Sequence, residues 1–286
     1  TTRQVNTDVN ILDHVRYHTS RIFIPHDHNM NSSSICIVCP DNTKQQQAKA
    51  LATQSGLPLL GDKSDDFDLQ LCFDDDYVEL FDTTLNTSIY VDFVEGALAH
   101  RQQYGGGRGQ AIARAIGLKH GNTPSVLDIT AGLARDAFVL ACMGCKITLV
   151  EQSLVLYTLI DDGIRRGLAN PVSAEVLKNF MNLVYADSIL CMEHMDRETM
   201  PDVIYIDPMY PERKKSALVK KDMQILQRLL GKDENAEALL KTALQCAGKR
   251  VVVKRPIHAE TLGDIKPDTS ISSKKTRYDV YLVSSQ

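Results

Sequence analysis

Long apolar runs are missing from this sequence, since none approaches the ~20 residues of a membrane-spanning helix, and we expect no membrane partner. The chain also opens without the charged, apolar and small-residue pattern of a secretory signal. Its seven cysteines are odd in number and scattered, which indicates free thiols rather than a disulfide framework. These absences favour a soluble, cytoplasmic protein of ordinary globular composition, with 43% hydrophobic and 24% charged residues.

A metal site has little support in the sequence. Two C-x-x-C pairs occur, Cys36 with Cys39 and Cys142 with Cys145, and paired motifs of this kind can bind zinc. The first pair lies in an apolar strand, where residues three apart point to opposite faces, and the second spans a helix-to-strand turn. The histidines of the first 34 residues have no cysteine or carboxylate cluster at ligand spacing. We therefore expect buried, inert cysteines and no metal.

The length of 286 residues allows two modest domains. We expect a small α/β domain over residues 1–95, of which 1–34 are weakly ordered, and a second domain over 96–286. The first domain is predicted to contain a helix ending at Gly56 and strands near residues 35–39, 67–73, 77–81 and 88–93. The glycine-rich segment 105–109 is either a hinge between the domains or a lid over the site.

After Pro124 the pattern alternates between strands and helices, which is typical of a parallel sheet with helices on its faces. The first helix of this part is expected over 135–143. We predict strands at residues 125–128, 146–151, 182–188, 202–207, 250–256 and 277–283, the last of them antiparallel to the others. In such sheets the carboxyl ends of the strands carry the ligand site.

The loop after the first of these strands indicates the kind of cofactor. It contains Gly132 but lacks the second and third glycines that give room to a pyrophosphate, which disfavours a nicotinamide cofactor. Glu151 closes the next strand nineteen residues later, at a spacing that suits a carboxylate binding the two ribose hydroxyls of an adenosine. S-adenosylmethionine carries no phosphate, and Asp128 is placed to accept from its ammonium group. This loop therefore suits S-adenosylmethionine.

Asp187 and Ser188 follow the third strand and are placed to meet the adenine amine and its neighbouring edge. Asp187 has an alternative role, because an aspartate in front of the segment S-I-L-C-M-E-H-M is also a good helix cap. The sequence leaves both roles open.

The stretch D-P-M-Y-P at 207–211 follows the apolar strand V-I-Y-I. Asp207 and the backbone carbonyl at Pro208 can accept both hydrogens of a planar exocyclic amine, while the ring of Tyr210 stacks on the base that carries it. Proline fixes the backbone direction at this point. The alternative is a simple strand-ending turn.

Charge is unevenly distributed over the chain. Eleven acids and one lysine lie between Asp62 and Glu95, whereas residues 213–221 hold five basic residues. A helix capped at Ser216 is expected to follow, with one apolar face and one polar face that includes Arg228. This polar face is either ordinary solvated surface or a contact for RNA phosphates. The candidate phosphate contacts are Arg213, Lys214, Lys215, Lys220 and Lys221.

Several motifs together resemble one known family. They are G-G-G-R-G-Q, D-I-T-A-G-L-A-R-D-A-F-V-L, the pair Glu151–Gln152, D-P-M-Y-P, K-S-A-L-V-K-K and K-R-V-V-V-K-R-P. Over about residues 92–283 the chain resembles the J-type enzymes of 16S rRNA, which are bacterial small-subunit ribosomal RNA guanine-N2 methyltransferases. The family often has glycine at the position of Ala134 and arginine at the position of Gln152, and its short N-terminus is unlike residues 1–34.

The resemblance implies a Rossmann-like class I methyltransferase sheet, S-adenosylmethionine as cofactor, and 16S rRNA or the small ribosomal subunit as partner. The implied reaction is methyl transfer to the exocyclic N2 of a specific guanine. Carried onto matching positions, the cofactor contacts would be Arg135, Asp136, Glu151, Gln152, Asp187, Ser188 and Asp207.

Two alternatives of different classes stay open. One keeps the cofactor and changes the substrate to adenine N6 in DNA or to a small-molecule amine, because D-P-x-Y suits any planar amine. The other is a non-catalytic RNA-binding module, which the joint presence of Asp128, Glu151, Asp187 and Asp207 disfavours.

Overall fold

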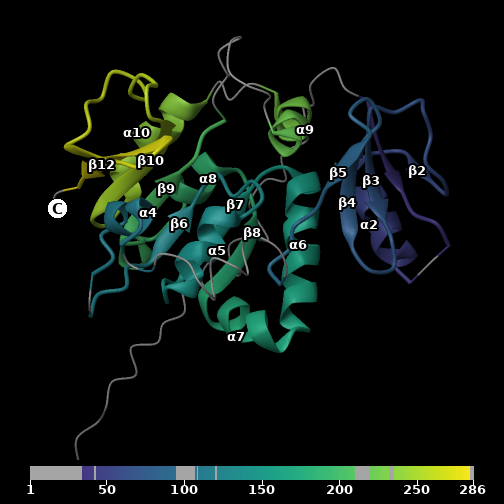
Figure 1. Ribbon diagram of the computed structural model, residues 1–286, viewed down its shortest axis with the longest axis horizontal. Helices are drawn as coiled ribbons and strands as arrows, with labels where there is room; N and C mark the ends of the chain where they lie inside the picture. The colour runs from purple at the N-terminus through teal and green to yellow at the C-terminus, as the bar shows by residue number, and fades with distance from the viewer. Residues whose placement is uncertain are drawn as a thin grey trace, which may run out of the picture.

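The computed structural model describes residues 34–41, 43–94, 107, 109–119, 121–209, 220–231 and 235–283. These residues form a five-stranded and a seven-stranded sheet (Figure 1). Across the larger sheet the strands are β11 (Thr269–Ser272), β12 (Thr276–Leu282), β10 (Arg250–Pro256), β9 (Val203–Ile206), β6 (Val126–Asp128), β7 (Ile147–Glu151) and β8 (Met181–Tyr185).

The larger sheet is mostly parallel. Strands β10, β9, β6, β7 and β8 pair in parallel, whereas β12 pairs antiparallel with both β10 and β11. The expected Rossmann-like sheet with an antiparallel last strand is thereby confirmed. Strand β11 was not predicted, because its sequence T-S-I-S is short and largely exposed and so lacks an apolar pattern.

Helices cover both faces of this sheet, which gives three layers (Figure 1). Along β9, Val203 and Tyr205 join the hydrophobic cluster on one face, and Ile204 and Ile206 join the cluster on the other, as strand alternation requires. The first face packs against α4 (Ala111–Ala115), α5 (Arg135–Cys142), α6 (Leu154–Leu168) and α7 (Pro171–Phe180), and α9 (Lys221–Leu230) belongs to the same hydrophobic cluster. The second packs against α8 (Ser188–Glu193) and α10 (Ala236–Cys246).

Helices α6 and α7 were not predicted from the sequence. Helix α6 is buried on several sides, and its buried residues include the polar Thr158 and Asp162 and the small Gly163. A Cβ added at Gly163 would lie 2.7 Å from a side-chain carbon of Val91, so the preceding chain packs directly on this helix. Burial on several sides removes the simple apolar stripe by which a surface helix is recognised. No described helix has the length and apolarity to cross a membrane.

The smaller sheet lies at the right of Figure 1 and comes from the first part of the chain. Its strands are β2 (Leu59–Leu60), β1 (Ile35–Val38), β3 (Leu69–Phe73), β4 (Val78–Asp82) and β5 (Thr87–Ile89). Helix α2 (Gln45–Ser55) ends at Gly56, whose φ of 73° is the left-handed conformation expected of a glycine cap. The predicted strand at 88–93 is shorter than expected, since β5 ends at Ile89.

The two sheets share one hydrophobic cluster, which includes residues of β1, β3 and β4 together with α5 and α6. Asp162 of α6 fixes the contact, because its buried carboxylate accepts from the backbone N–H of Val78 at 3.0 Å and pairs with Lys44 at 3.3 Å. Arg166, one helical turn later, donates to Asp162 at 2.8 Å and to the carbonyl oxygen of Val91. The proposed domain boundary near residue 95 lies outside the described residues, as do residues 1–33, so the domain division stays a prediction.

Candidate active site

Four neighbouring strands bring ionisable side chains to one edge of the large sheet. Glu151 ends β7, Asp128 ends β6, Asp207 directly follows β9, and Lys254 lies near the end of β10. Parallel strands all end at the same edge, so these groups line up across it. The three acids were predicted from the sequence, whereas Lys254 was not. The sequence feature that could have revealed Lys254 is a single lysine after the apolar run V-V-V, in the strand that pairs with the one preceding Asp207.

Thr130 joins the loop after β6 to the residue after β9. Its backbone N–H donates to Oδ1 of Asp128 at 3.0 Å, and its hydroxyl lies 3.4 Å from the same oxygen. The hydroxyl oxygen also accepts from the backbone N–H of Asp207 at 2.7 Å. The backbone at Asp207 is thereby held in place by the loop that starts at Asp128.

The carboxylate of Glu151 is held beside the same loop. The backbone N–H of Gly132 donates to its Oε2 at 3.2 Å, and the N–H of Ser153 donates to its Oε1 at 2.8 Å. Gly132 has a φ of +56° and Ala134 has a φ of +54°, so the loop turns through the left-handed region twice. Glycine adopts this conformation readily, whereas the methyl group of Ala134 strains it.

Lys254 connects two acids from different elements. Its Nζ donates to Oδ2 of Asp207 at 2.7 Å and to Oδ2 of Asp136 at 2.8 Å. Asp136 lies in the first turn of α5 and also accepts from the hydroxyl of Tyr205 at 2.7 Å. Tyr205 is buried within β9, so the network joins α5, β9 and β10. Neither Lys254 nor Tyr205 was anticipated as part of the site.

Electrostatics at this edge are dominated by acids. Burial raises the pKa of Asp128 to about 7, and the nearby charges of Asp136 and Asp207 add to the rise, while hydrogen bonds from Thr130 oppose it. Desolvation also raises the pKa of Asp207, and the ammonium of Lys254 opposes that rise. Burial lowers the pKa of Lys254, but Asp207 and Asp136 outweigh this and raise it above its usual value.

Two carboxylates therefore share one ammonium group, and two further carboxylates, those of Asp128 and Glu151, lie beside the loop. Such an edge favours a ligand that carries positive charge and hydroxyl groups, and it disfavours a diphosphate. S-adenosylmethionine has a sulfonium, an ammonium and two ribose hydroxyls but no phosphate. The donor set fits this cofactor.

Comparisons with known proteins decide the family. The family model described as "Putative SAM-dependent methyltransferase" matches residues 50–283. The chain belongs to this methyltransferase family. Its fold, its enzymatic nature and its cofactor S-adenosylmethionine follow from that membership.

Individual relatives agree with the family. The chain is 49% identical to a protein of Shewanella amazonensis named ribosomal RNA small subunit methyltransferase J, over 77% of this chain and 88% of that protein. A protein of the same name from Colwellia psychrerythraea is 48% identical over 87% of this chain and 93% of its own length. The crystal structure of a SAM-dependent methyltransferase from Neisseria gonorrhoeae is 34% identical, with a TM-score of 0.68, and covers 86% of this chain and 95% of that one. The resemblance to the J-type family is therefore confirmed.

The expected adenine contacts of this methyltransferase have further structural tasks. Oδ1 of Asp187 accepts from the backbone N–H of Leu190 at 2.9 Å, so the aspartate does cap α8. The hydroxyl of Ser188 is buried and donates to the carbonyl oxygen of Ile129 at 2.7 Å, which ties α8 to the loop after β6. Both residues lie next to that loop, and their contact with adenine stays a prediction.

Three further residues are cofactor contacts implied by the family, and each lies in a different environment. Arg135 begins α5, and its Nη1 lies 2.6 Å from Oδ2 of Asp222 on α9, which lowers the pKa of that acid against its partial burial. Gln152 is exposed directly after β7. Asp136 accepts hydrogen bonds from Lys254 and Tyr205, and Lys254 places it beside Asp207.

The D-P-M-Y stretch is described as far as Met209. Pro208 is buried, which fixes the chain direction immediately after Asp207, and two fifths of the Asp207 side chain is exposed at this edge. Tyr210 lies outside the described residues, as do Gly105, Gly106 and Arg108 of the glycine-rich segment. The stacking role of Tyr210 stays a prediction.

The basic segment is described only from Lys220 onwards, because Arg213, Lys214, Lys215 and Ser216 lie outside the described residues. Helix α9 begins at Lys221 with Lys220 as its N-cap residue, later in the chain than the expected start at Ser216. Both lysines are exposed, and Nζ of Lys221 lies 3.4 Å from the carbonyl oxygen of Leu85.

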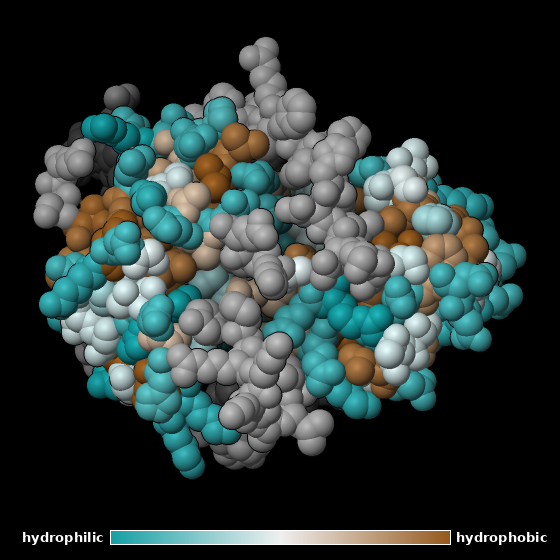
Figure 2. All heavy atoms as spheres, turned by 90° about the horizontal axis from the view of Figure 1, so that it is seen from above, coloured by the Kyte–Doolittle hydropathy of each residue, from teal (hydrophilic) through white to brown (hydrophobic). Residues whose placement is uncertain are grey.

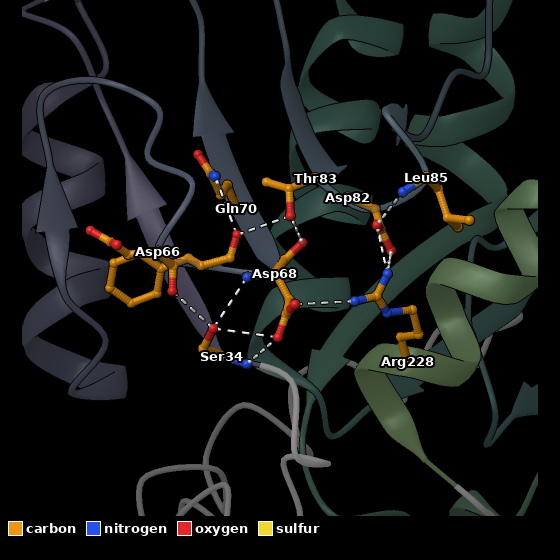
Figure 3. A network of polar contacts seen from close by, with 9 residues as sticks. Ser34, Asp66, Asp68, Gln70, Asp82, Thr83, Leu85 and Arg228 are labelled. Carbon is orange, nitrogen blue, oxygen red and sulfur yellow. Dashed lines mark hydrogen bonds and ion pairs between the residues drawn. The ribbon is translucent and has the colours of Figure 1, made fainter.

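Arg228 does not belong to a solvated basic face, and that expectation was wrong. Figure 3 shows its guanidinium pointing from α9 to the smaller sheet, where it meets Asp82 and Asp68. Its Nη1 donates to both oxygens of the fully buried Asp82, at 2.7 and 2.8 Å, and Asp82 also accepts from the N–H of Leu85. The reason is that a buried carboxylate needs a charged partner, and α9 is the element that packs beside β5.

All seven cysteines have free thiols. Cys36 packs in a small cluster with Val38 and Cys72, whereas Cys39 belongs to the main core, so the two point to different faces. Burial raises the pKa of Cys36 and of Cys142 to about 11. Thiols that stay protonated at neutral pH are poor nucleophiles and poor ligands.

Proposed function

We propose that this methyltransferase transfers a methyl group from S-adenosylmethionine to the exocyclic N2 amine of one guanine in 16S rRNA. The observation that carries the proposal is the position of Asp207. It follows β9 at the centre of the acidic edge, with its backbone fixed by Thr130 and its Oδ2 occupied by Lys254. Relatives that are 46 to 53% identical carry the name ribosomal RNA small subunit methyltransferase J, which supports an rRNA substrate.

Asp207 presents one carboxylate oxygen to the substrate. Because Lys254 binds Oδ2, the other oxygen remains to accept a hydrogen from the guanine amine, and the carbonyl of Pro208 accepts the second. The amine is a weak nucleophile, since its lone pair is delocalised into the ring. Hydrogen bonds to both amine hydrogens turn that lone pair out of the ring plane, which is the positioning that methyl transfer needs.

The donor supplies an electrophilic methyl carbon bound to a sulfonium. When the nitrogen–carbon bond forms and the sulfur–carbon bond breaks, the amine nitrogen becomes positive and must release a proton. The oxygen of Asp207 that holds the N–H is placed to take that proton. Burial raises the pKa of this carboxyl, and the ammonium of Lys254 opposes that rise because it favours the charged form.

The cofactor residues are proposed on the other side of Asp207. Asp128 would accept from the methionine ammonium, Gly132 would leave room beside the loop, and Glu151 would accept from the ribose hydroxyls. Asp187 and Ser188 would meet the adenine at the start of α8. Arg135 and Gln152 complete the proposed set. Tyr210 would stack on the flipped base, and the basic residues 213–221 would contact phosphates. We place the reaction in the cytoplasm, in agreement with seven free thiols.

The proposal is tested by mapping methylated nucleotides in 16S rRNA from cells with and without the gene. We expect one N2-methylguanine to disappear in the deletion and to return with the wild-type protein. Purified protein, radiolabelled cofactor and deletion-strain small subunits or rRNA then show which form is the substrate. Loss of a methyladenine, or label entering DNA instead of rRNA, would contradict the proposal.

A further inference from the structure

The strand order divides the acidic edge into two halves around Asp207. On one side lie β6, β7 and β8, whose ends carry the residues proposed for the methyl donor. On the other side lie β10, β12 and β11, to which no substrate contact has been assigned, since Lys254 of β10 contacts Asp207 and Asp136. An RNA strand that delivers one base to Asp207 must continue across part of this edge. The half formed by β10, β12 and β11 is the one that the proposed cofactor site does not occupy.

The hairpin between β11 and β12 lies at this open half. Because β11 is antiparallel to β12, and β12 is antiparallel to β10, the turn that joins β11 to β12 lies at the same edge as the carboxyl end of β10. Pro256 at the end of β10 is paired with Thr276, the first residue after the turn. Adjacent strands are about 4.8 Å apart, so β12 lies roughly 10 Å from β9 along the sheet.

The tip of this hairpin consists of two lysines. The N–H of Ser273 donates to the carbonyl oxygen of Thr276 at 2.7 Å, which leaves only Lys274 and Lys275 in the loop. Two-residue hairpin loops favour glycine, asparagine and aspartate, because these residues adopt positive φ values easily. Neither lysine has a positive φ, so the turn does not account for the choice of two adjacent lysines.

The base of the hairpin is rigidly attached to the end of β10. The N–H of Ile257 donates to the carbonyl oxygen of Lys275 at 3.2 Å. Arg277 donates to both carboxylate oxygens of the buried Asp279, at 2.8 and 2.9 Å, and to the carbonyl oxygens of Ile257 and Ala259. Arg277 is therefore used within the protein. The two lysines at the tip are held in a fixed position relative to Lys254, three residues before Ile257.

Lys274 and Lys275 are exposed, and among the described residues neither lies within ion-pair distance of a carboxylate. Some other exposed lysines do have such partners, for example Lys249 with Asp202 and Lys241 with Glu237. Figure 2, which views the molecule from above, shows hydrophilic residues interspersed with hydrophobic ones over the described surface. Exposed ammonium groups without acidic partners are suited to phosphate contacts.

We propose that Lys274 and Lys275 bind the phosphate backbone of the substrate RNA, so that the RNA crosses the ends of β9, β10 and β12. The inference rests on the proposed rRNA methyltransferase function and adds a path for the RNA to it. The path continues from Asp207 away from the cofactor, on the opposite side from Glu151. Phosphate contacts carry no sequence information, so the role of the hairpin is to hold the RNA in register with the site.

The test compares two double variants of equal charge change. In Lys274→Gln/Lys275→Gln the hairpin tip is neutralised. In Lys119→Gln/Lys146→Gln two exposed lysines are neutralised near the amino ends of β6 and β7, at the opposite edge of the sheet. For each protein, binding of a 16S rRNA transcript is measured over a series of salt concentrations, and KM and kcat are measured with the same transcript. Calorimetry with S-adenosylmethionine serves as the check on folding and on the donor site.

We expect the hairpin variant to bind RNA more weakly. Its slope of log affinity against log salt concentration should be less steep than that of the wild type by about 1.4, which corresponds to the loss of two single-strand phosphate contacts. Its KM for RNA should rise while its kcat and its cofactor affinity stay unchanged, and the control variant should keep the wild-type slope. A wild-type slope in the hairpin variant, or an equal loss in the control, would overturn the inference. Failure of the wild-type protein to methylate rRNA would instead contradict the proposed function.

Discussion

Nζ of Lys254 lies 2.7 Å from Oδ2 of Asp207, and this contact joins the ends of two adjacent parallel strands, β10 and β9. The same nitrogen lies 2.8 Å from Asp136, at the start of the helix that follows the proposed cofactor loop. One ammonium group therefore fixes the acid proposed to bind the substrate amine relative to the element that borders the donor. This arrangement makes Lys254 a positioning residue for methyl transfer.

Replacing Lys254 by methionine should slow methyl transfer without weakening cofactor binding. The side chain keeps its length, but Asp207 loses the ammonium group that orients it and favours its charged form. We expect kcat to fall by about 10²-fold, as for the loss of one oriented polar group in other active sites. Because the site becomes more negative, S-adenosylmethionine should bind at least as tightly as before. Weaker cofactor binding at unchanged kcat, measured by calorimetry and single-turnover kinetics, would contradict this role.

Cofactor binding should depend on pH through Asp128. Its pKa of about 7 means that the ionised form, which accepts from the ammonium of the cofactor, is the minor form at pH 6.0. Between pH 7.5 and 6.0 the dissociation constant should rise about eightfold, in proportion to the loss of the carboxylate. The variant Asp128→Asn should bind weakly but without this dependence. Equal affinity of the wild-type protein at both pH values would show that Asp128 does not hold the ammonium.

The raised pKa of Asp128 also makes the free energy of unfolding depend on pH. Folded Asp128 binds its proton more tightly than the unfolded chain does, so its contribution is complete below pH 3.8 and is lost as the pH rises towards 7. The loss amounts to at most about 4 kcal/mol in the cofactor-free protein. The free energy of unfolding, measured with urea at several pH values, should therefore fall more steeply with rising pH for the wild-type protein than for Asp128→Asn. Parallel curves would refute this linkage.

Ala134→Gly should stabilise the protein slightly. Ala134 has a φ of +54° and is buried, so it pays the steric cost of the left-handed conformation, about 1 to 2 kcal/mol. Glycine removes this strain but adds entropy to the unfolded chain, at about 0.5 to 1 kcal/mol. We expect a net gain of about 0.5 to 1 kcal/mol in the free energy of unfolding, measured by urea titration. A clear loss of stability would mean that the methyl group contributes packing that outweighs the strain.

Arg228→Met should destabilise the contact between α9 and the smaller sheet. The fully buried carboxylate of Asp82 would lose its charged partner, at a cost of about 3 kcal/mol. Lys241→Met is the matched control, because it breaks the exposed pair with Glu237 and should change the free energy of unfolding far less. Similar free energies of unfolding for the two variants would mean that Asp82 finds another partner when Arg228 is removed.

Much of the large sheet is predictable from sequence, because most of its parallel strands are short apolar runs buried on both faces. The strands that end in Asp128, Glu151 and Asp207 are of this kind, and their terminal acids mark the functional edge. Residues 152–181 were harder, because α6 is buried on several sides and carries the polar Asp162 inside. Strand β11 has almost no apolar residues and forms only because β12 offers it a partner.

The ion pairs of the site were less predictable than the acids at the ends of its strands. Lys254 and Asp136 are 118 residues apart, and nothing local indicates that they meet. Their contact depends on the order of strands in the sheet, which places β10 beside β9 and α5 above them. Arg228 shows the same limit, because a helical wheel assigns it to a polar face without revealing that Asp82 lies opposite.

The central claim is that Asp207 positions the substrate amine, and a matched pair of variants tests it most directly. Asp207→Ala removes the carboxylate at the carboxyl end of β9. Asp202→Ala makes the same change just before β9 begins, where Asp202 bonds to Ser125 and Lys249. The measurement is the rate of methyl incorporation from radiolabelled S-adenosylmethionine into 16S rRNA, with folding checked by thermal unfolding. We predict that Asp207→Ala abolishes turnover in a folded protein that still binds the cofactor, while Asp202→Ala retains it; near-normal turnover in Asp207→Ala would contradict the account.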